Sequence, residues 1–486
     1  MSLQLNRPIS RRHVSSNAAI SSMRTAKVQS HRFVVRGVYL LFVALIAEGI
    51  GRKWIFPSQH EYLYFFRDPL LLGFYFLAAK HVAIRHKGWL AMWIGTACFI
   101  SLTSLVVYMF SDMSPALWIL GVRNYFLYIP LAFIVAGTFE RDDVERFTRF
   151  VAVLAVAIAF VCVKQFFSPP GGWINVGAGG QPPPGFADGL LRTTGLLASD
   201  AQHITYVLFS LSLLAAATIS AKLKSRNGFV LIVGGIATFI MMIVSGSRGV
   251  WFQAAGVGIV AASSFFLMRS GTGTKLRGIM VSLTAALLIA ALFSTVFGEA
   301  NKAYEQRNIN ANTFSGNTTE RIIGLFLPSS MFEASVVGVG IGMGTQSARA
   351  VRTGKSNFSY FNVAEGDLDR NFLELGLVSG WIFVALRYAF TIWLVWMGLR
   401  AARKGDMTAL LLSSFSAFAI FQSQITMHTT YAHLAWFATG LTIAAARFAR
   451  APVSARVAET GWMPPRRVVG GWRPSFDPPV PGPSRR

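Results

Sequence analysis

Charged residues are scarce in this sequence. Of its 486 residues only 14% are Asp, Glu, Lys or Arg, whereas 53% are hydrophobic; a soluble globular protein is about 25% charged. Cysteine is rarer still, because the only two, Cys98 and Cys162, lie inside apolar runs. These absences exclude an intrinsically disordered chain and make a disulfide scaffold or a cysteine-based metal site improbable. They also argue against a soluble enzyme.

Long apolar runs are what the sequence has instead. Stretches of roughly 18 or more apolar residues recur, and each is long enough to cross a hydrocarbon core about 30 Å thick. The runs are continuous rather than alternating, which disfavours a β-barrel. We therefore predict an all-α polytopic membrane protein with about 12 transmembrane helices, at residues 34–56, 69–82, 89–110, 116–137, 147–167, 203–221, 229–245, 249–268, 279–297, 372–399, 407–425 and 431–448.

Acidic residues are outnumbered: 21 Asp and Glu stand against 45 Lys and Arg, a net charge of +24. In a soluble protein this excess would suggest a nucleic-acid partner. Here basic loops such as 222–228 alternate with loops free of Lys and Arg, such as 111–115 and 426–430, as the positive-inside rule requires. We expect no nucleic-acid partner, and we expect a multi-pass protein of the bacterial inner membrane with both termini in the cytoplasm.

The chain divides into two tails and a membrane domain. Residues 1–33 form a basic cytoplasmic tail without the apolar stretch of a signal peptide. The transmembrane domain covers 34–448, and the Pro-, Gly- and Arg-rich 449–486 is typical of a disordered cytoplasmic tail. Loops 168–202 and 299–371 fall on the predicted periplasmic side, the second between helices 9 and 10. Loops this long are usually functional or disordered.

A group of charged residues begins at Glu48 in the stretch EGIGRKWIFP. Glu48 and Arg52 are four residues apart, so they share one helical face and can pair. Lys53 and Trp54 are typical of an anchor at the membrane interface. Asp68, in the sequence RDP, is placed to cap the next helix. These charges either hold helices together or are accessory to a site.

Arginines on the predicted outer side form a second set. Arg248 lies in a tight turn between two spans, where the positive-inside rule disfavours a cation. Arg192 and Arg321 lie in the two long loops. Arginine binds phosphate oxygens in a planar bidentate fork and keeps its charge. Several such groups would hold an anionic lipid diphosphate; the alternative is that each pairs with a nearby acid or a phospholipid head.

Acids crowd the start of the tenth span in the sequence EGDLDRNFLELGLVSGW. Asp367, Asp369 and Glu374 are candidates for a general base that activates a sugar hydroxyl, with Arg370 among them. Helix capping and salt bridging at the helix start is the alternative.

A glycine-rich segment and three histidines complete the candidates. GVGIGMG, at 338–344, either cradles phosphate with its backbone N–H groups or forms a flexible turn. His203, His428 and His433 fall near the outer ends of spans, each a base or a satisfied polar residue. The sequence has no HExxH and no cysteine cluster, so we expect no metal and no cofactor.

Four segments together resemble one family. RTTGLLASDAQHITYVLFSL, SGSRGVWFQAAGVG, TERIIGLFLPSSMFEASVVGVGIGMG and DRNFLELGLVSGW occur in an order and topology that resemble the O-antigen ligase and Wzy-type polysaccharide polymerase superfamily, over roughly residues 192–380. EGIGRKWIFP followed by RDPL also resembles the start of a subgroup of exopolysaccharide polymerases. The resemblance implies metal-independent glycan transfer from an undecaprenyl diphosphate carrier on the periplasmic face.

The resemblance also implies roles for individual residues. In the family, outer-face arginines hold the diphosphate, and by motif position these match Arg248 and Arg321, and Arg192 with less agreement. Ligases carry His-Asn before the acidic-glycine motif, where this chain has Arg370-Asn371 preceded by Asp369. The missing histidine favours a polymerase over a ligase, and it leaves the catalytic base unidentified.

The sequence thus predicts a glycosyltransferase that joins carrier-linked repeat units into exopolysaccharide or O-antigen. Its partners would be the undecaprenyl-diphosphate-linked glycan, membrane lipids, and a chain-length regulator and flippase of the same pathway. Two alternatives remain: an O-antigen ligase or protein O-glycosyltransferase, and, from another class, a transporter or lipid flippase. A transporter predicts charged or broken helices at mid-membrane.

Overall fold

The computed structural model describes residues 11–111, 114–181, 185–187, 190–220, 226–267, 328–344 and 366–449. These residues belong to one unit, Met1–Ala449. They are helical apart from loops and one small antiparallel sheet, in which β1 (Gly185–Ala187) pairs with β2 (Leu190–Leu191). The predicted class, an α-helical membrane protein, is confirmed.

Eleven of the predicted spans overlap one or two helices, and the remaining one, 279–297, lies outside the described residues. The longer helices are α1 (Arg11–Ile50), α3 (Arg67–Ala79), α4 (Lys87–Met109), α5 (Pro115–Phe126), α6 (Ile129–Thr138), α7 (Arg141–Phe166), α8 (Asp200–Ser220), α9 (Arg226–Val244), α10 (Arg248–Leu267), α15 (Asp367–Ala402), α16 (Thr408–Gln422) and α17 (Thr429–Phe448). Short turns of helix are η1 (Gly51–Ile55), η2 (Pro57–Gln59), α2 (His60–Leu63), η3 (Ala178–Gly180) and η4 (Ser329–Met331).

Six segments of the described residues are long and apolar enough to cross a membrane. They are Val28–Ile55, Lys87–Met109, Pro115–Thr138, Arg141–Phe166, Asp200–Thr218 and Asp367–Ala402. Three shorter apolar helices accompany them: Gly228–Val244, Gly249–Ser263 and Thr408–Gln422. The count of twelve spans stays a prediction.

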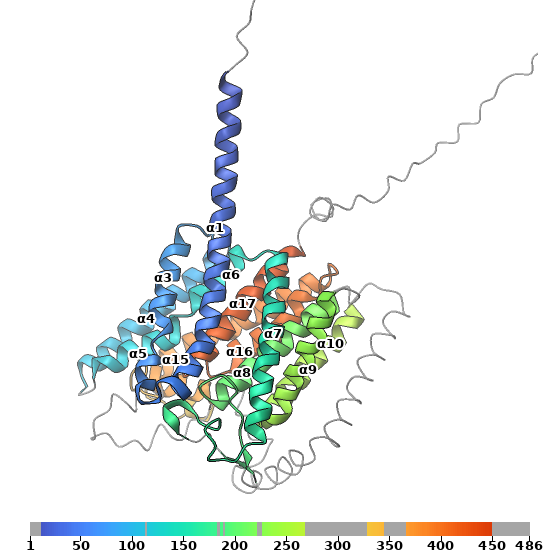
Figure 1. The fold of residues 1–486 in the computed structure, drawn as a ribbon. Helices are drawn as coiled ribbons and strands as arrows, with labels where there is room; N and C mark the ends of the chain where they lie inside the picture. The colour runs from blue at the N-terminus through green and yellow to red at the C-terminus, as the bar shows by residue number, and fades with distance from the viewer. Residues whose placement is uncertain are drawn as a thin grey trace, which may run out of the picture. The chain divides into compact units, whose positions relative to one another are not determined.

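The helices pack into one bundle with an aromatic core (Figure 1). Trp93 of α4 meets Trp436 of α17 with ring centroids 5.1 Å apart, and both side chains are buried. Large apolar side chains such as Phe76, Phe160 and Ile392 are exposed on the outside. A helix that is apolar on its buried and its exposed faces is typical of a membrane environment.

Proline breaks the fourth predicted span into α5 and α6. Pro130 lies in the first turn of α6 and has no N–H to continue the helix. Tyr75 of α3 donates its hydroxyl to the carbonyl of Leu127 at 2.8 Å, at the junction. The adjacent Tyr128 is thereby placed inside the bundle, where it is 1% exposed.

Helix α15 doubles back on itself at Gly376, whose φ of 76° and ψ of 179° are non-helical. Asp367 and Arg387 are twenty residues apart, which a straight helix would separate by about 30 Å. Their side chains instead form an ion pair of 2.7 Å between Oδ2 and Nη1. The rings of Phe372 and Trp381 also lie face to edge, 5.3 Å between centroids. The first nine residues of α15 therefore pack alongside the rest.

The doubling back changes the predicted tenth span. We expected one helix over 372–399, whereas the continuous helix begins after Gly376. Backbone groups released by the break pair with a neighbouring loop: the N–H of Gly340 donates to Glu374 at 2.9 Å, and that of Leu377 to Ser335 at 2.9 Å. Gly338 and Gly376 touch so closely that a Cβ on Gly338 would lie 2.3 Å from the backbone nitrogen of Gly376.

The predicted tails and long loops are described only in part. Helix α1 begins at Arg11, within the stretch 1–33 that we expected to be a tail, and 450–486 lies outside the described residues. Loop 168–202 contains η3 and the small sheet. Of loop 299–371, only 328–344 and 366–371 are described.

Candidate functional site

Buried and half-buried charges gather at one end of the bundle, where α1 ends and α3, α8 and α17 begin. This is the end that the loop charges predict to be periplasmic. We call it the charge-rich end, and its charged members are Glu48, Arg52, Lys53, Arg67, Asp68, Arg123, Arg192, Asp200, Asp367, Arg370, Glu374 and Arg387.

Glu48 pairs with two arginines at once. Its Oε1 accepts from Arg52 Nη1 at 3.1 Å, as the spacing predicted, and its Oε2 accepts from Arg67 Nε. Arg67 also donates to the hydroxyls of Thr429 at 3.0 Å and Thr430 at 3.2 Å. Glu48 thus ties α1 to α3, Arg67 ties α3 to α17, and one carboxylate faces two guanidinium charges.

Asp68 binds Arg123 of α5 through both carboxylate oxygens, at 2.5 Å and 3.1 Å. The guanidinium of Arg123 also lies over the rings of Tyr64 and Phe65, 4.5 Å and 4.7 Å from their centroids. This arrangement differs from the expected capping role: the N-cap position of α3 is Phe66, which makes no side-chain cap hydrogen bond, and Asp68 instead pairs with another helix.

Lys53 is the clearest difference from expectation at this end. We expected an anchor at the membrane surface, but Lys53 is 2% exposed. Its ammonium donates to Thr194 Oγ1 at 2.6 Å and to the Gly195 carbonyl at 2.7 Å. Gln165 accepts from the backbone N–H groups of the same two residues, at 3.1 Å and 2.9 Å. The TTG motif is therefore held by η1 and α7, and within the described residues the hydrogen-bond acceptors of Lys53 are neutral oxygens.

The carboxylates proposed as general bases differ in burial and in their hydrogen-bond partners. Asp367 is buried between Arg387 and the Thr426 hydroxyl, which donates at 2.6 Å. Arg387 in turn donates to the Ile420 carbonyl at the end of α16, at 2.8 Å. Asp369 is only half-buried and accepts from the hydroxyl of Ser330 at 2.7 Å. Asp369 is thus the most accessible of the three.

Glu374 organises the glycine-rich segment. Its carboxylate, 0% exposed, accepts from the backbone N–H of Gly342 at 3.1 Å and of Gly344 at 2.5 Å. The Tyr125 hydroxyl donates to it as well, at 2.8 Å. The loop's N–H groups are thereby turned toward this carboxylate, a binding mode that glycine loops also use for phosphate. Arg370 lies beside the same loop: a Cβ on Gly344 would be 2.5 Å from its Cδ.

The arginines proposed to hold diphosphate are only partly described. Arg192 pairs with Asp200 at the start of α8, 2.9 Å between Nη1 and Oδ2. Arg248 begins α10, but the position of its side chain is outside the described set, as is all of Arg321. Their predicted contact with one ligand stays a prediction.

His428 lies just before α17, with its ring stacked on Tyr431 at 5.4 Å between centroids. Burial lowers the pKa of this imidazole to about 4, and the charges of Arg370 and Arg52 lower it further, against the opposing effect of Asp200. The histidine is therefore neutral at pH 7, and it lies among charges from three helices.

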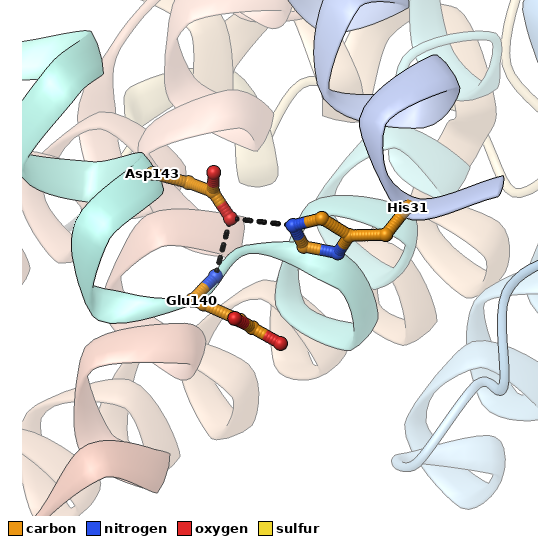
Figure 2. Close-up of side chains that lie close together, drawn as sticks. All are labelled: His31, Glu140 and Asp143. Carbon is orange, nitrogen blue, oxygen red and sulfur yellow. Dashed lines mark hydrogen bonds and ion pairs between the residues drawn. The ribbon is translucent and has the colours of Figure 1, made fainter. Parts of the chain in front are cut away.

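The opposite end of the bundle holds a different group, His31, Glu140 and Asp143, whose side-chain ligand atoms all lie within 4.8 Å of one another (Figure 2). Asp143 Oδ2 accepts from His31 Nε2 at 2.9 Å and from the Glu140 N–H at 3.0 Å. Glu140 and Asp143 form a reciprocal capping box at the start of α7. Helix capping accounts for this arrangement, and we assign no metal to it.

Sequence reasoning missed several residues of the charge-rich end: Arg67, Arg387, Gln165 and Tyr125. Each is a polar side chain inside an otherwise apolar stretch, next to a motif. Polar residues within membrane segments are costly and mark functional or structural sites, and this signal was present.

A comparison of the chain with protein-family models and with curated proteins finds no match. The resemblance to the ligase and polymerase superfamily therefore depends on the motifs themselves.

Proposed function

We propose that this protein is a membrane glycosyltransferase that polymerises lipid-diphosphate-linked glycan repeat units at the charge-rich end. The observation that carries the proposal is an excess of buried positive charge. Around Glu48 and Asp68 stand Arg52, Arg67 and Arg123, three guanidinium cations for two carboxylates, and Lys53, which hydrogen-bonds to neutral groups. Buried charge that is not balanced costs free energy, and an anionic substrate would balance it.

Arg52 is the described residue best placed to contact that substrate. Its Nη1 is held by Glu48, and its side chain is 13% exposed. A guanidinium that is fixed by one carboxylate and still partly exposed is prepared to bind phosphate oxygens. We assign it to the carrier diphosphate together with Arg248, Arg321 and, less directly, Arg192.

The convergence of the motifs supports the same proposal. The TTG segment contacts η1 through Lys53, and the glycine-rich loop is bound to the acidic-glycine motif through Glu374. His428 is close enough to both Arg52 and Arg370 for their charges to act on it. Segments that are distant in sequence and that carry the family resemblance are thus assembled at one end of the bundle.

In the proposed reaction a sugar hydroxyl of one glycan attacks the anomeric carbon of another. The new C–O bond forms as the bond to the carrier diphosphate breaks, and the diphosphate leaves with the electron pair. Arginines stabilise the charge that develops on it. The hydroxyl proton passes to a base, for which Asp369 is the candidate because Asp367 and Glu374 are buried and fully engaged.

A second class is favoured by one observation. Helix α15 is broken at Gly376 and carries the buried pair Asp367–Arg387, and discontinuous helices are typical of transporters. Flippase activity is therefore the alternative to be tested beside glycan transfer.

Deleting the gene and analysing carrier-linked glycans separates the possibilities. Single repeat units accumulating on the outer side of the membrane indicate a polymerase, and long polymer left on the carrier indicates a ligase. Single units trapped on the inner side indicate a flippase and would overturn the proposal. Complementation with Arg52→Ala, against Arg141→Ala as a matched control from the opposite end, then tests whether the charge-rich end is the site.

A further inference from the structure

Three buried polar atoms inside the bundle lack hydrogen-bond partners among the described residues: Arg67 Nη1, Tyr128 Oη and His433 Nδ1. Their side chains belong to α3, to the junction of α5 with α6, and to α17. The three residues are only 1–2% exposed. Buried polar atoms are paired in the great majority of cases, so three unpaired atoms in one region call for a common explanation.

Arg67 and His433 both lie close to the ring of Tyr128. The guanidinium carbon of Arg67 lies 5.9 Å from the centre of the Tyr128 ring, and the rings of Tyr128 and His433 are 5.6 Å apart, tilted by 47°. Arg67 donates to Thr429 and Thr430. His433 follows Thr429 by four positions and therefore lies on the same face of α17, one turn deeper.

The chemistry of the three groups restricts what can join them. An arginine N–H only donates, a tyrosine hydroxyl donates or accepts, and Nδ1 of a neutral imidazole does one or the other. A water molecule accepts from the arginine and can donate to the other two. Buried waters typically make about three hydrogen bonds, to groups that would otherwise be unsatisfied.

Charge favours a neutral molecule over an ion at this place. The cation of Arg67 is already matched by Glu48, which binds its Nε, and both side chains are within 2% of full burial. An anion beside Arg67 would also lie near the Glu48 carboxylate and be repelled by it. The unbalanced charge belongs to Arg52, on the more exposed side of Glu48.

We propose that Arg67, Tyr128 and His433 bind one buried water molecule. The water completes a hydrogen-bonded chain that runs from Arg52 through Glu48 and Arg67 to His433, from the rim of the charge-rich end into the bundle. This hydrogen-bonded chain joins α1, α3 and α17 through polar groups. The inference does not depend on glycan transfer and would hold equally in a transporter.

A high-resolution map of the full-length protein in lipid nanodiscs is the direct test. We expect density for one light atom within hydrogen-bond distance of all three groups. A map with direct contact between Arg67 and His433, or with nothing between them, overturns the proposal. Crystals soaked in bromide provide the ion test: anomalous signal at this place shows an anion site and also overturns it.

Thermal unfolding of the full-length protein in detergent is the second test. If water joins the three groups, Tyr128→Phe removes one of its partners and lowers the midpoint by about 2–4 °C. In a His433→Leu background the same change should lower it by less than half as much, because the shared water is already lost. If the hydroxyl of Tyr128 is simply unpaired, Tyr128→Phe leaves the midpoint unchanged or raises it, which overturns the proposal.

Tyr75→Phe is the matched control, because the Tyr75 hydroxyl bonds directly to the Leu127 carbonyl. It should lower the midpoint to the same extent with or without His433→Leu. Should the Tyr128 variant not accumulate, the map alone decides.

Discussion

At the charge-rich end, the side chains of Arg67 and Arg387 are at most 1% exposed. Their partners Glu48 and Asp367 are at most 2% exposed, so neither ion pair reaches solvent. At the opposite end Arg141 pairs with Asp406 while 55% exposed, and His31 pairs with Asp143 while 27% exposed. Exposed pairs contribute little to stability, whereas breaking a buried pair leaves a charge without compensation. The comparison indicates that the first end is built to hold charge away from water and the second to cap helices.

The largest expected difference between the ends concerns Arg387. Replacing it in Arg387→Met leaves Asp367 charged and buried, so we expect a loss of about 3–5 kcal/mol in the free energy of unfolding. Arg141→Met, at the opposite end, should cost less than about 1 kcal/mol. Unfolding in mixed detergent, followed by tryptophan fluorescence, measures both. Equal losses would show that burial does not separate the two ends.

A second expected effect is the acid sensitivity of the charge-rich end. Because the pKa of His428 is about 4 in the folded protein and about 6.5 when unfolded, the unfolded state binds a proton first as the pH falls. The contribution of His428 to the free energy of unfolding should therefore be fully present above about pH 6.5. It should decrease by as much as about 3 kcal/mol by about pH 4. His428→Gln should remove this component. The difference between wild-type and variant stability across this pH range is the measurement, and a constant difference would contradict it.

Third, the three carboxylates of the acidic-glycine motif should separate into two classes. Asp369→Asn should lower polymer formed per membrane-inserted protein by about 100-fold or more, as loss of a general base does. Asp367→Asn and Glu374→Gln should instead lower the amount of folded protein, because both acids hold other elements in place. If all three amides remain active and His428→Ala is inactive, the base is the histidine.

Fourth, arginines proposed to contact the diphosphate should matter for turnover and not for folding. Alanine at Arg52, Arg248 or Arg321 should slow polymer formation by about 10- to 1000-fold, with membrane insertion near normal. Lysine should restore part of the activity because it keeps the charge but loses the bidentate fork. Full activity per inserted protein in the alanine variants would remove the diphosphate site from this end.

The smallest expected effect lies at the opposite end, in the pair His31–Asp143. His31→Gln keeps a hydrogen-bonding side chain near the capping box, so we expect a change below about 0.5 kcal/mol in unfolding free energy and unaltered polymer formation. A large loss of activity would mean that this end also takes part in function and would weaken the contrast between the ends.

The sequence predicted the helical class and most helix positions because continuous apolar runs report directly on burial in lipid. It also predicted the pairing of Glu48 with Arg52, which follows from helical spacing. It failed at Gly376, because a single glycine inside an apolar run does not reveal that the chain reverses there. The partners of Lys53 and Arg67 lie 141 and 362 positions away, and no local pattern encodes contacts at such separations.

The contact between Arg67 and α17 has a consequence for the order of synthesis. Arg67 enters the membrane with the second helical segment, whereas Thr429 and Thr430, which accept its hydrogen bonds, are made 362 and 363 residues later. At translation rates of roughly 5–20 residues per second this delay lasts on the order of half a minute. Until the last helix arrives, the cation lacks these two hydrogen bonds. A chain that ends before α17 should therefore be recognised as incomplete by membrane quality control, even though every earlier helix has been inserted.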